Sequence, residues 1–324
     1  MTSPLRSLRR RILTPPLSQT SLDVRGFHVK SPEAKDRLET IGRTFLTGYA
    51  FAAEAARPRS AEGPLATVPA PFRGFAYEGA SMAFAVRDGL PVGGRRHVAG
   101  FLEGEADRHV YMVYVGVGWA MARLPRFRWP TLYAPDPLLR WLVLDGFGFH
   151  QAYFKTSGYV HQHLREERFP WPADGPAGYP NKVIDQGVGR ATWFVGGADP
   201  DVVAELLGRF PENRHADLWS GAGLAATYAG GAKRAELEHF WDLAGRYRPQ
   251  VAQGAAFAAA ARVRADLVVP HNELAADVFC GMSAAAAAKV TDEALVDLPP
   301  DGKRPAFAVW RERIGDTFAQ LGRC

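Results

Sequence analysis

The stretch Leu144-Asp145-Gly146-Phe147-Gly148-Phe149-His150 carries a pattern that recurs along the chain. Each copy has a glycine, a small residue two positions later and a third marked residue four positions later, within a largely apolar segment. His150 occupies the third position here, where every other copy has alanine. The other copies are Gly48/Ala50/Ala52, Gly79/Ser81/Ala83, Gly116/Gly118/Ala120, Gly187/Gly189/Ala191, Gly221/Gly223/Ala225, Gly254/Ala256/Ala258 and, in weaker form, Gly281/Ser283/Ala285.

The leading glycines are 27 to 41 residues apart, a period typical of helix-pair repeats. On a helix, positions 0 and 4 lie on one side and position 2 lies nearly opposite, so both flanks can be approached closely. Glycine inside a helix costs about 1 kcal/mol relative to alanine, which argues against a chance match in an alanine- and glycine-rich chain. We expect an all-α helix-hairpin repeat array of about seven to eight units, either a tetratricopeptide-like solenoid or a closed α/α toroid.

The predicted array begins after residue 30. Ser31-Pro32-Glu33 supplies a capping serine, a proline in the first turn and an acid, which together mark a helix start. We expect residues 1–30 to form an N-terminal arm that lies on the body through Phe27 and Val29, and residues 31–324 to form a single helical-repeat domain. A repeat array also accounts for a chain of 324 residues, which is longer than one compact core usually supports.

The composition is that of an ordinary folded protein, with 47% hydrophobic and 23% charged residues. The net charge of +5 is dispersed, and the one dense basic run, Arg9-Arg10-Arg11, lacks interleaved aromatic residues. We therefore expect a solvated tail there and no nucleic-acid partner. The longest uncharged apolar segment, Val110 to Ala122, predicts a buried helix, because a membrane span needs about 20 residues. With no recognisable secretory signal and no CxxC pair, the sequence predicts a cytoplasmic protein.

None of the high-specificity catalytic motifs is present: there is no P-loop, Rossmann fingerprint, nucleophile elbow or HExxH. The spacing of histidines and cysteines fixes no set of metal ligands, and the cofactor, if there is one, stays unknown. Instead, a polar residue directly precedes the repeated glycine in five copies. These residues would lie along one surface if the units stack, and they are Glu78, Asp145, Gln186, Ser220 and Gln253.

Four positions after each of these polar residues, a large side chain lies on the same predicted helix face. A surface of aromatic rings with a few acids and amides suits a long apolar ligand. Ordinary core residues with satisfied polar groups are the alternative interpretation. The candidate substrate-binding residues are Tyr77, Met82, Trp119, Phe149, Tyr153, Gln186 and Phe257.

Five residues are candidates for chemistry. Because His150 replaces the repeated alanine, its imidazole either fits beside a smaller neighbour or points into a cavity, where it could act as an acid or base near pH 7. A hydrogen-bonded core histidine is the alternative. Asp185, Gln186 and Arg190 form a polar cluster that could bind a carboxylate or thioester end, or simply make an internal ion pair. The candidate catalytic residues are Glu78, Asp145, His150, Asp185 and Arg190.

Several segments resemble the bacterial enediyne-cluster protein family of unassigned function. They are Arg43 to Tyr49, Arg73 to Ala80, Leu138 to Trp141, Asp145 to His150, Asp185 to Arg190 and Asp217 to Gly221, and the resemblance extends from about Ser31 to Trp310. Members of that family are encoded beside the iterative polyketide synthase that makes the linear polyene precursor of an enediyne core. The resemblance implies a role in maturing or handling this polyene, with a hydrophobic polyene or polyketide and other enediyne-pathway proteins as partners. It implies no particular reaction, because the family carries no assigned catalytic residues.

Two hypotheses follow. In the first, the protein is an enzyme that cyclises or desaturates a long polyene. In the second, it is a non-enzymatic repeat scaffold that binds the polyene or a partner protein of the pathway. A closed tunnel would favour the enzyme and an open groove the scaffold, and the irregular segments Pro125 to Pro137 and Arg168 to Pro180 are long enough to close over a ligand. Acids and amides embedded in apolar helices are unfavourable unless used, which favours the enzyme.

Overall fold

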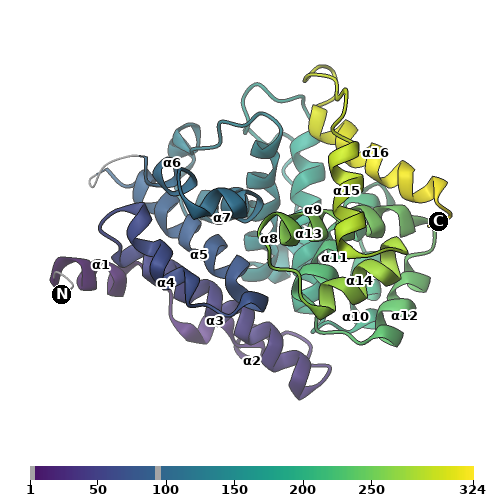
Figure 1. The fold of residues 1–324 in the computed structure, drawn as a ribbon, viewed down its shortest axis with the longest axis horizontal. Helices are drawn as coiled ribbons and strands as arrows, with labels where there is room; N and C mark the ends of the chain where they lie inside the picture. The colour runs from purple at the N-terminus through teal and green to yellow at the C-terminus, as the bar shows by residue number, and fades with distance from the viewer. Residues whose placement is uncertain (1–3, 92–95) are drawn as a thin grey trace.

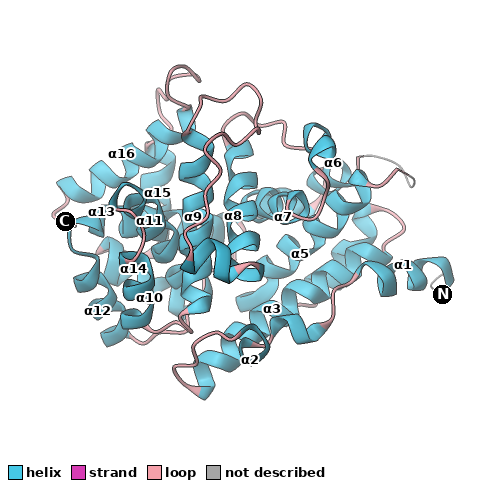
Figure 2. Cartoon of the chain, turned by 180° about the vertical axis from the view of Figure 1, so that it is seen from behind, coloured by secondary structure: helices cyan, strands magenta, loops and turns pink. Residues whose placement is uncertain are grey.

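The computed structural model describes residues 4–91 and 96–324, and within these ranges it contains helices and loops but no strand (Figure 2). The predicted all-α class is therefore confirmed. The α-helices are α1 (Pro4–Leu13), α2 (Leu22–Arg25), α3 (Pro32–Glu54), α4 (Glu62–Ala66), α5 (Ala70–Gly89), α6 (His97–Leu102), α7 (Val110–Met121), α8 (Leu142–Phe154), α9 (Tyr179–Val195), α10 (Pro200–Gly208), α11 (Glu212–Ala229), α12 (Arg234–Ala244), α13 (Arg248–Arg264), α14 (Pro270–Cys280), α15 (Ala284–Glu293) and α16 (Ala306–Gln320).

A series of long helices packs one against the next in chain order: α3, α5, α7, α8, α9, α11, α13 and then α15. The shorter helices α10, α12 and α14 lie between members of this series in the chain and also contact one another. Figure 1 shows α1 to α4 on one side of the molecule and α10 to α16 on the other, with α8 and α9 between them. The long helices therefore form a framework that the remaining segments cover.

The repeated glycines allow the backbones of successive long helices to meet. A methyl group added at Gly187 of α9 would collide with the carbonyl oxygen of Asp145 in α8, and one added at Gly189 would collide with the carbonyl oxygen of Leu218 in α11. Both flanks of α9 are thus approached closely, as the spacing predicts. The same carbonyl collisions with a neighbouring long helix would follow at Gly48, Gly79, Gly116, Gly118, Gly146, Gly148, Gly221, Gly223 and Gly254.

Two copies of the pattern differ from the prediction. In α3, Gly48 faces Ala76 of the following helix, whereas in copies such as that of α9 it is the second small residue that faces the following helix. The predicted positions of the α3 copy are therefore shifted by two residues along the helix. The weakest copy, Gly281/Ser283/Ala285, does not begin inside a helix. Gly281 ends α14 with a φ of 69°, a left-handed conformation that favours glycine, and Ser283 caps the start of α15 through a hydrogen bond from the amide of Ala286.

The N-terminal segment is more ordered than the predicted arm. Helix α1 packs against α3, and Arg9 donates hydrogen bonds to the carbonyl oxygens of Ala53 and Ala55 at the end of α3. The expectation of a solvated basic tail is therefore wrong at Arg9, because its guanidinium satisfies carbonyls that the helix end leaves free. Phe27 is buried as expected, whereas Val29 is 39% exposed.

Other local signals predict structure correctly. Helix α3 begins at Pro32, and the hydroxyl of Ser31 accepts a hydrogen bond from the amide of Ala34. The apolar segment from Val110 forms the largely buried helix α7. Within the described residues no single helix has both the length and the apolar character to cross a membrane, although α14 and α15 pass that test as a pair bent by 60°.

We predict that Gly187→Ala lowers the free energy of unfolding by about 1–3 kcal/mol, because the new methyl group pushes α8 and α9 apart at the Asp145 carbonyl. Denaturant unfolding followed by circular dichroism measures this change. Gly208→Ala in α10 is the matched control, since no atom lies within 4 Å of the added methyl group. It should leave stability unchanged or raise it through helix propensity. Equal destabilisation by both variants would contradict the close-contact explanation.

Candidate functional site

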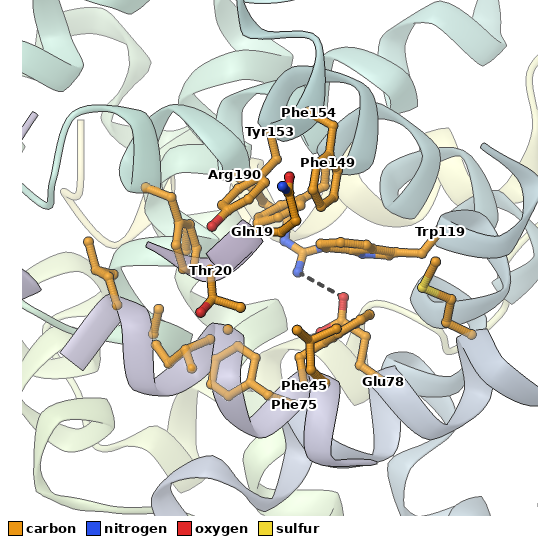
Figure 3. A pocket seen from close by; sticks show the side chains of 18 of the residues that line it. Gln19, Thr20, Phe45, Phe75, Glu78, Trp119, Phe149, Tyr153, Phe154 and Arg190 are labelled. Atoms are coloured by element: carbon orange, nitrogen blue, oxygen red, sulfur yellow. Dashed lines mark ion pairs between the residues drawn. The ribbon is translucent and has the colours of Figure 1, made fainter. Parts of the chain in front are cut away.

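An apolar cavity lies inside the framework of long helices. It contains about 810 Å³ of space between atoms, part of which is open to solvent. Figure 3 shows side chains from several helices pointing into it. Aromatic residues dominate the lining, and they are Phe45, Phe75, Trp119, Phe149, Tyr153, Phe154, Phe194 and Tyr228.

The two ends of the cavity differ in character. Pro15, Gln19 and Thr20 of the N-terminal segment and the exposed Arg123 line its outer end. Glu78 of α5 and Arg190 of α9 line the part that is shut away from solvent, since they are only 2% and 6% exposed. A ligand would therefore enter past the N-terminal segment and Arg123, and would meet the buried Glu78 and Arg190 only at depth.

A second apolar pocket adjoins the first. It has about 520 Å³ of space between atoms and shares Arg190, Leu224 and Tyr228 with the main cavity. Its remaining lining includes Asp145 and Phe257. Arg190 and Tyr228 thus stand at the junction of two apolar spaces.

Arg190 is the centre of a buried charged cluster. It forms an ion pair with Asp145 of α8, and its Nη2 lies 4.0 Å from Oε1 of Glu78. The amide of Gln186 donates a 2.7 Å hydrogen bond to Oδ2 of Asp145. The Arg190 guanidinium also lies 5.1 Å from the centre of the Phe149 ring. Asp145 is therefore fully engaged, whereas Glu78 has only a distant cationic partner.

Burial raises the pKa of the Glu78 carboxyl to about 7; Arg190 opposes this shift and Asp145 adds to it. Near neutral pH this group is therefore divided between its acid and its carboxylate form. A carboxyl with such a pKa can both donate and accept a proton, which is what general acid–base chemistry requires. No other carboxyl lines the main cavity among the described residues.

His150 does not line either pocket. Its ring lies behind the lining, 5.5 Å from that of Trp119 and 4.7 Å from that of Phe154, measured between ring centres. Burial, together with the charge of Arg123, lowers the pKa of His150 to about 3, so the imidazole is neutral. The structure does not support the alternative in which His150 points into a cavity, because the side chains of Trp119 and Phe154 lie between its imidazole and the main cavity.

Asp185 is separated from the Arg190 cluster. Its carboxylate is held by Arg214 of α11, with Nη2 donating to Oδ1 at 2.6 Å. The expected cluster of Asp185, Gln186 and Arg190 is therefore wrong in its membership. Neighbouring positions on a helix point about 100° apart, so Asp185 and Gln186 take different partners.

The other predicted residues divide between the cavity and the core. Met82, Trp119, Phe149 and Tyr153 line the main cavity, and Phe257 lines the second pocket. Tyr77 instead stacks on the ring of His109 with 3.7 Å between ring centres. Gln186 supports Asp145 from behind, and Ser220 donates a 2.6 Å hydrogen bond to Gln253. For these amides the alternative of satisfied core residues holds only in part, because the Oε1 of Gln186 and the Nε2 of Gln253 have no hydrogen-bond partner among the described residues.

Sequence reasoning missed part of the lining. Phe194 and Tyr228 lie seven positions after Gly187 and Gly221, one helical turn beyond the predicted large residues, so extending the pattern by a turn would have found them. Gln19 and Thr20 carry no such signal, because they reach the cavity only through tertiary packing.

The two irregular segments do not cover the cavity. None of the residues that line it comes from Pro125 to Pro137 or Arg168 to Pro180. These segments pack on each other instead, with the rings of Trp129 and Phe169 stacked 5.2 Å apart. The sequence leaves open whether these segments close over a ligand, and in the structure the N-terminal segment lines the outer end of the cavity instead. In the described part of the chain no three His, Cys, Asp or Glu side chains are grouped so as to hold a metal ion.

We predict that Glu78 makes folding pH-dependent. Its folded pKa of about 7 exceeds the ordinary 4.5, so its stabilisation is complete below pH 4.5 and is lost as the pH rises through about 7. The free energy of unfolding of wild type, relative to that of Glu78→Gln, should therefore fall between pH 5 and pH 8. Denaturant unfolding of both proteins across this range measures the change.

Three buried histidines give the opposite slope at acidic pH, because burial lowers the pKa of His109, His150 and His271 to about 3 each. They are present in both proteins, so the comparison removes them. Parallel stability curves for wild type and variant would show that the Glu78 carboxyl has an ordinary pKa.

Comparison with known proteins identifies the family. No curated protein and no solved structure matches the chain. A family model described as "Protein of unknown function (DUF1702)" matches residues 4–318, a range that includes every residue of the cavity and of the Arg190 cluster. The chain belongs to this DUF1702 family of proteins of unknown function.

Proposed function

We propose that this protein binds a long apolar polyene inside the aromatic cavity and converts it by proton transfer, as a step in enediyne biosynthesis in the cytoplasm. The observation that carries the proposal is the buried Glu78 carboxyl, with its pKa near 7, in the wall of a cavity otherwise lined by aromatic and aliphatic side chains. The enediyne assignment is supported by the resemblance of the segments around Gly48, Gly79, Gly146 and Gly187.

The proposal includes the architecture that forms the cavity. The serial packing of long helices through glycine contacts supports a helix-hairpin repeat array. Contacts between the two ends of the series support closure into a toroid: Arg262 of α13 donates a 3.0 Å hydrogen bond to the carbonyl oxygen of Pro71 in α5, and Arg264 pairs with Asp107 at 3.0 Å. A closed ring would surround a ligand laterally, which favours an enzyme over an open scaffold.

The chemistry follows from the charges around Glu78. The protonated carboxyl donates its proton to a carbon of the polyene, so that an O–H bond breaks and a C–H bond forms from one π-electron pair. The resulting cation is delocalised along the conjugated chain, and the faces of aromatic rings such as Trp119 and Phe149 stabilise it. The cluster changes from neutral to a net charge of −1, because Arg190 and Asp145 cancel, and this charge attracts the cation.

Ring closure and proton return complete the sequence. A second double bond of the same chain attacks the cation and forms a C–C bond. Loss of a proton from a neighbouring carbon to the Glu78 carboxylate then restores a double bond and the acid. The net change is an isomerisation or cyclisation in which no electrons are gained or lost.

A second candidate function is binding without conversion. The ion pair of Asp145 and Arg190 is extended by a hydrogen bond from Gln186, and a buried polar network of this kind also suits a structural role. The protein would then hold the polyene for a partner enzyme of the pathway, or act as a scaffold for partner proteins.

Absorption spectroscopy separates these functions, because a conjugated polyene reports its own loss. With wild type we expect a spectral shift on binding followed by progressive loss of the polyene bands, at a rate that falls as the pH rises through about 7, where Glu78 loses its proton. Glu78→Gln should retain the shift and lose at least 100-fold in rate, the contribution typical of a positioned acid.

Glu103→Gln, at an exposed position outside the cavity, is the matched control and should behave as wild type. Full activity of Glu78→Gln would refute the assigned acid. A stable shift without any loss of the bands in wild type would favour binding without conversion. No spectral change at all would exclude both polyene functions and leave the protein-binding scaffold.

A further inference from the structure

Three buried hydrogen-bond donors beside the cavity have no partner within the described part of the chain. They are the hydroxyl of Tyr228, the Nε of Arg190 and the Nε1 of Trp119. These residues are only 3%, 6% and 8% exposed, so bulk water does not satisfy the donors. Folded proteins leave few buried donors unpaired, and each exception calls for an explanation.

The donors gather near the charged cluster. Arg190 and Tyr228 line both pockets, and the charges of Glu78 and Arg190 act on the Tyr228 hydroxyl, whose pKa is raised mainly by burial. Figure 3 shows Trp119 beside Arg190 and Glu78. The indole N–H of Trp119 is near enough to lower the pKa of Glu78, yet it forms no hydrogen bond within 3.5 Å.

The surrounding protein offers these donors little else. The Tyr228 hydroxyl lies against Gly74, where an added side chain would collide with it. The Nη1 of Arg190 is committed to Asp145. One acceptor atom placed at the junction of the two pockets would therefore meet unused N–H and O–H groups.

We propose that the ligand is an oxygenated polyene, whose neutral carbonyl oxygen accepts hydrogen bonds from Tyr228 and Arg190 while its conjugated chain fills the main cavity. This inference rests on the proposed function and specifies its substrate class: a ketone, ester or thioester rather than a bare hydrocarbon. The carbonyl fixes the position of the chain, so that a particular carbon lies beside the Glu78 carboxyl.

The charge of the cluster argues for a neutral carbonyl rather than a carboxylate. Arg190 is already neutralised by Asp145 at direct contact, and Glu78 lies 4.0 Å from Arg190. A ligand carboxylate would add a buried negative charge beside two carboxyl groups. Arg262, whose guanidinium lies 3.9 Å from the centre of the Tyr228 ring, already donates hydrogen bonds to the carbonyl oxygens of Pro71 and Tyr228. A carbonyl oxygen uses the donors without that penalty.

Three probes of equal chain length test the inference: a conjugated tetraene hydrocarbon, the corresponding tetraene methyl ketone and the corresponding tetraene carboxylate. Their fluorescence on transfer from water into the cavity gives dissociation constants. We expect wild type to bind the ketone at least roughly tenfold more tightly than the hydrocarbon, because the carbonyl accepts from the neutral Tyr228 and from the charged Arg190. Tyr228→Phe should lower this preference roughly threefold to tenfold, the range expected for one neutral hydrogen bond, while changing hydrocarbon binding less than about twofold.

Met82→Leu is the matched control, because it alters the cavity wall without touching a donor; it should affect the ketone and the hydrocarbon equally. Equal binding of ketone and hydrocarbon by wild type, or tightest binding of the carboxylate, would overturn the inference. An equal loss for both ligands in Tyr228→Phe would overturn it too. If wild type binds none of the probes, the proposed function fails as well, whereas binding of the hydrocarbon without ketone preference refutes the carbonyl alone.

Discussion

Close contact between helix backbones is the constraint on which the rest of this structure depends. Gly187 touches the Asp145 carbonyl on one flank of α9, and Gly189 touches the Leu218 carbonyl on the other. In the copies of α7, α8, α9 and α11, positions 0 and 2 thus point to the two neighbouring helices, and the residues at −1, +3 and +7 are left on the face between them. In α9 these are Gln186, Arg190 and Phe194. The same small residues that bring the helices together therefore select which side chains face inward.

This arrangement brings charged side chains together in a buried part of the protein. Asp145, Arg190 and Glu78 come from three different helices and meet at the inner part of the cavity. The short contact between Asp145 and Arg190 satisfies one carboxylate, which leaves the more distant Glu78 to respond to burial through its raised pKa. The site therefore contains one fixed ion pair, Asp145 with Arg190, and one carboxyl, that of Glu78, which exchanges a proton near neutral pH.

The apolar part of the site has a different origin. Aromatic rings from six of the long helices enclose the main cavity, and the segment at Gln19 and Thr20 covers its outer end. Because that segment precedes the long helices in the chain, the residues that cover the outer end and the residues that form the cavity wall come from separate parts of the sequence. Entry of a ligand and the proposed chemistry at Glu78 can therefore be altered separately.

The sequence by itself determined the helical class, the small-residue contacts and most of the inward-facing positions, because helical periodicity fixes which residues share a face. Met82, Trp119, Phe149 and Arg190 all follow from that rule. Only the tertiary structure decided that Arg190 pairs with Asp145 and not with Asp185, that His150 lies behind Trp119, and that Gln19 reaches the cavity. Periodicity carries no information about which residues of distant helices meet, since that depends on how the helices pack in space.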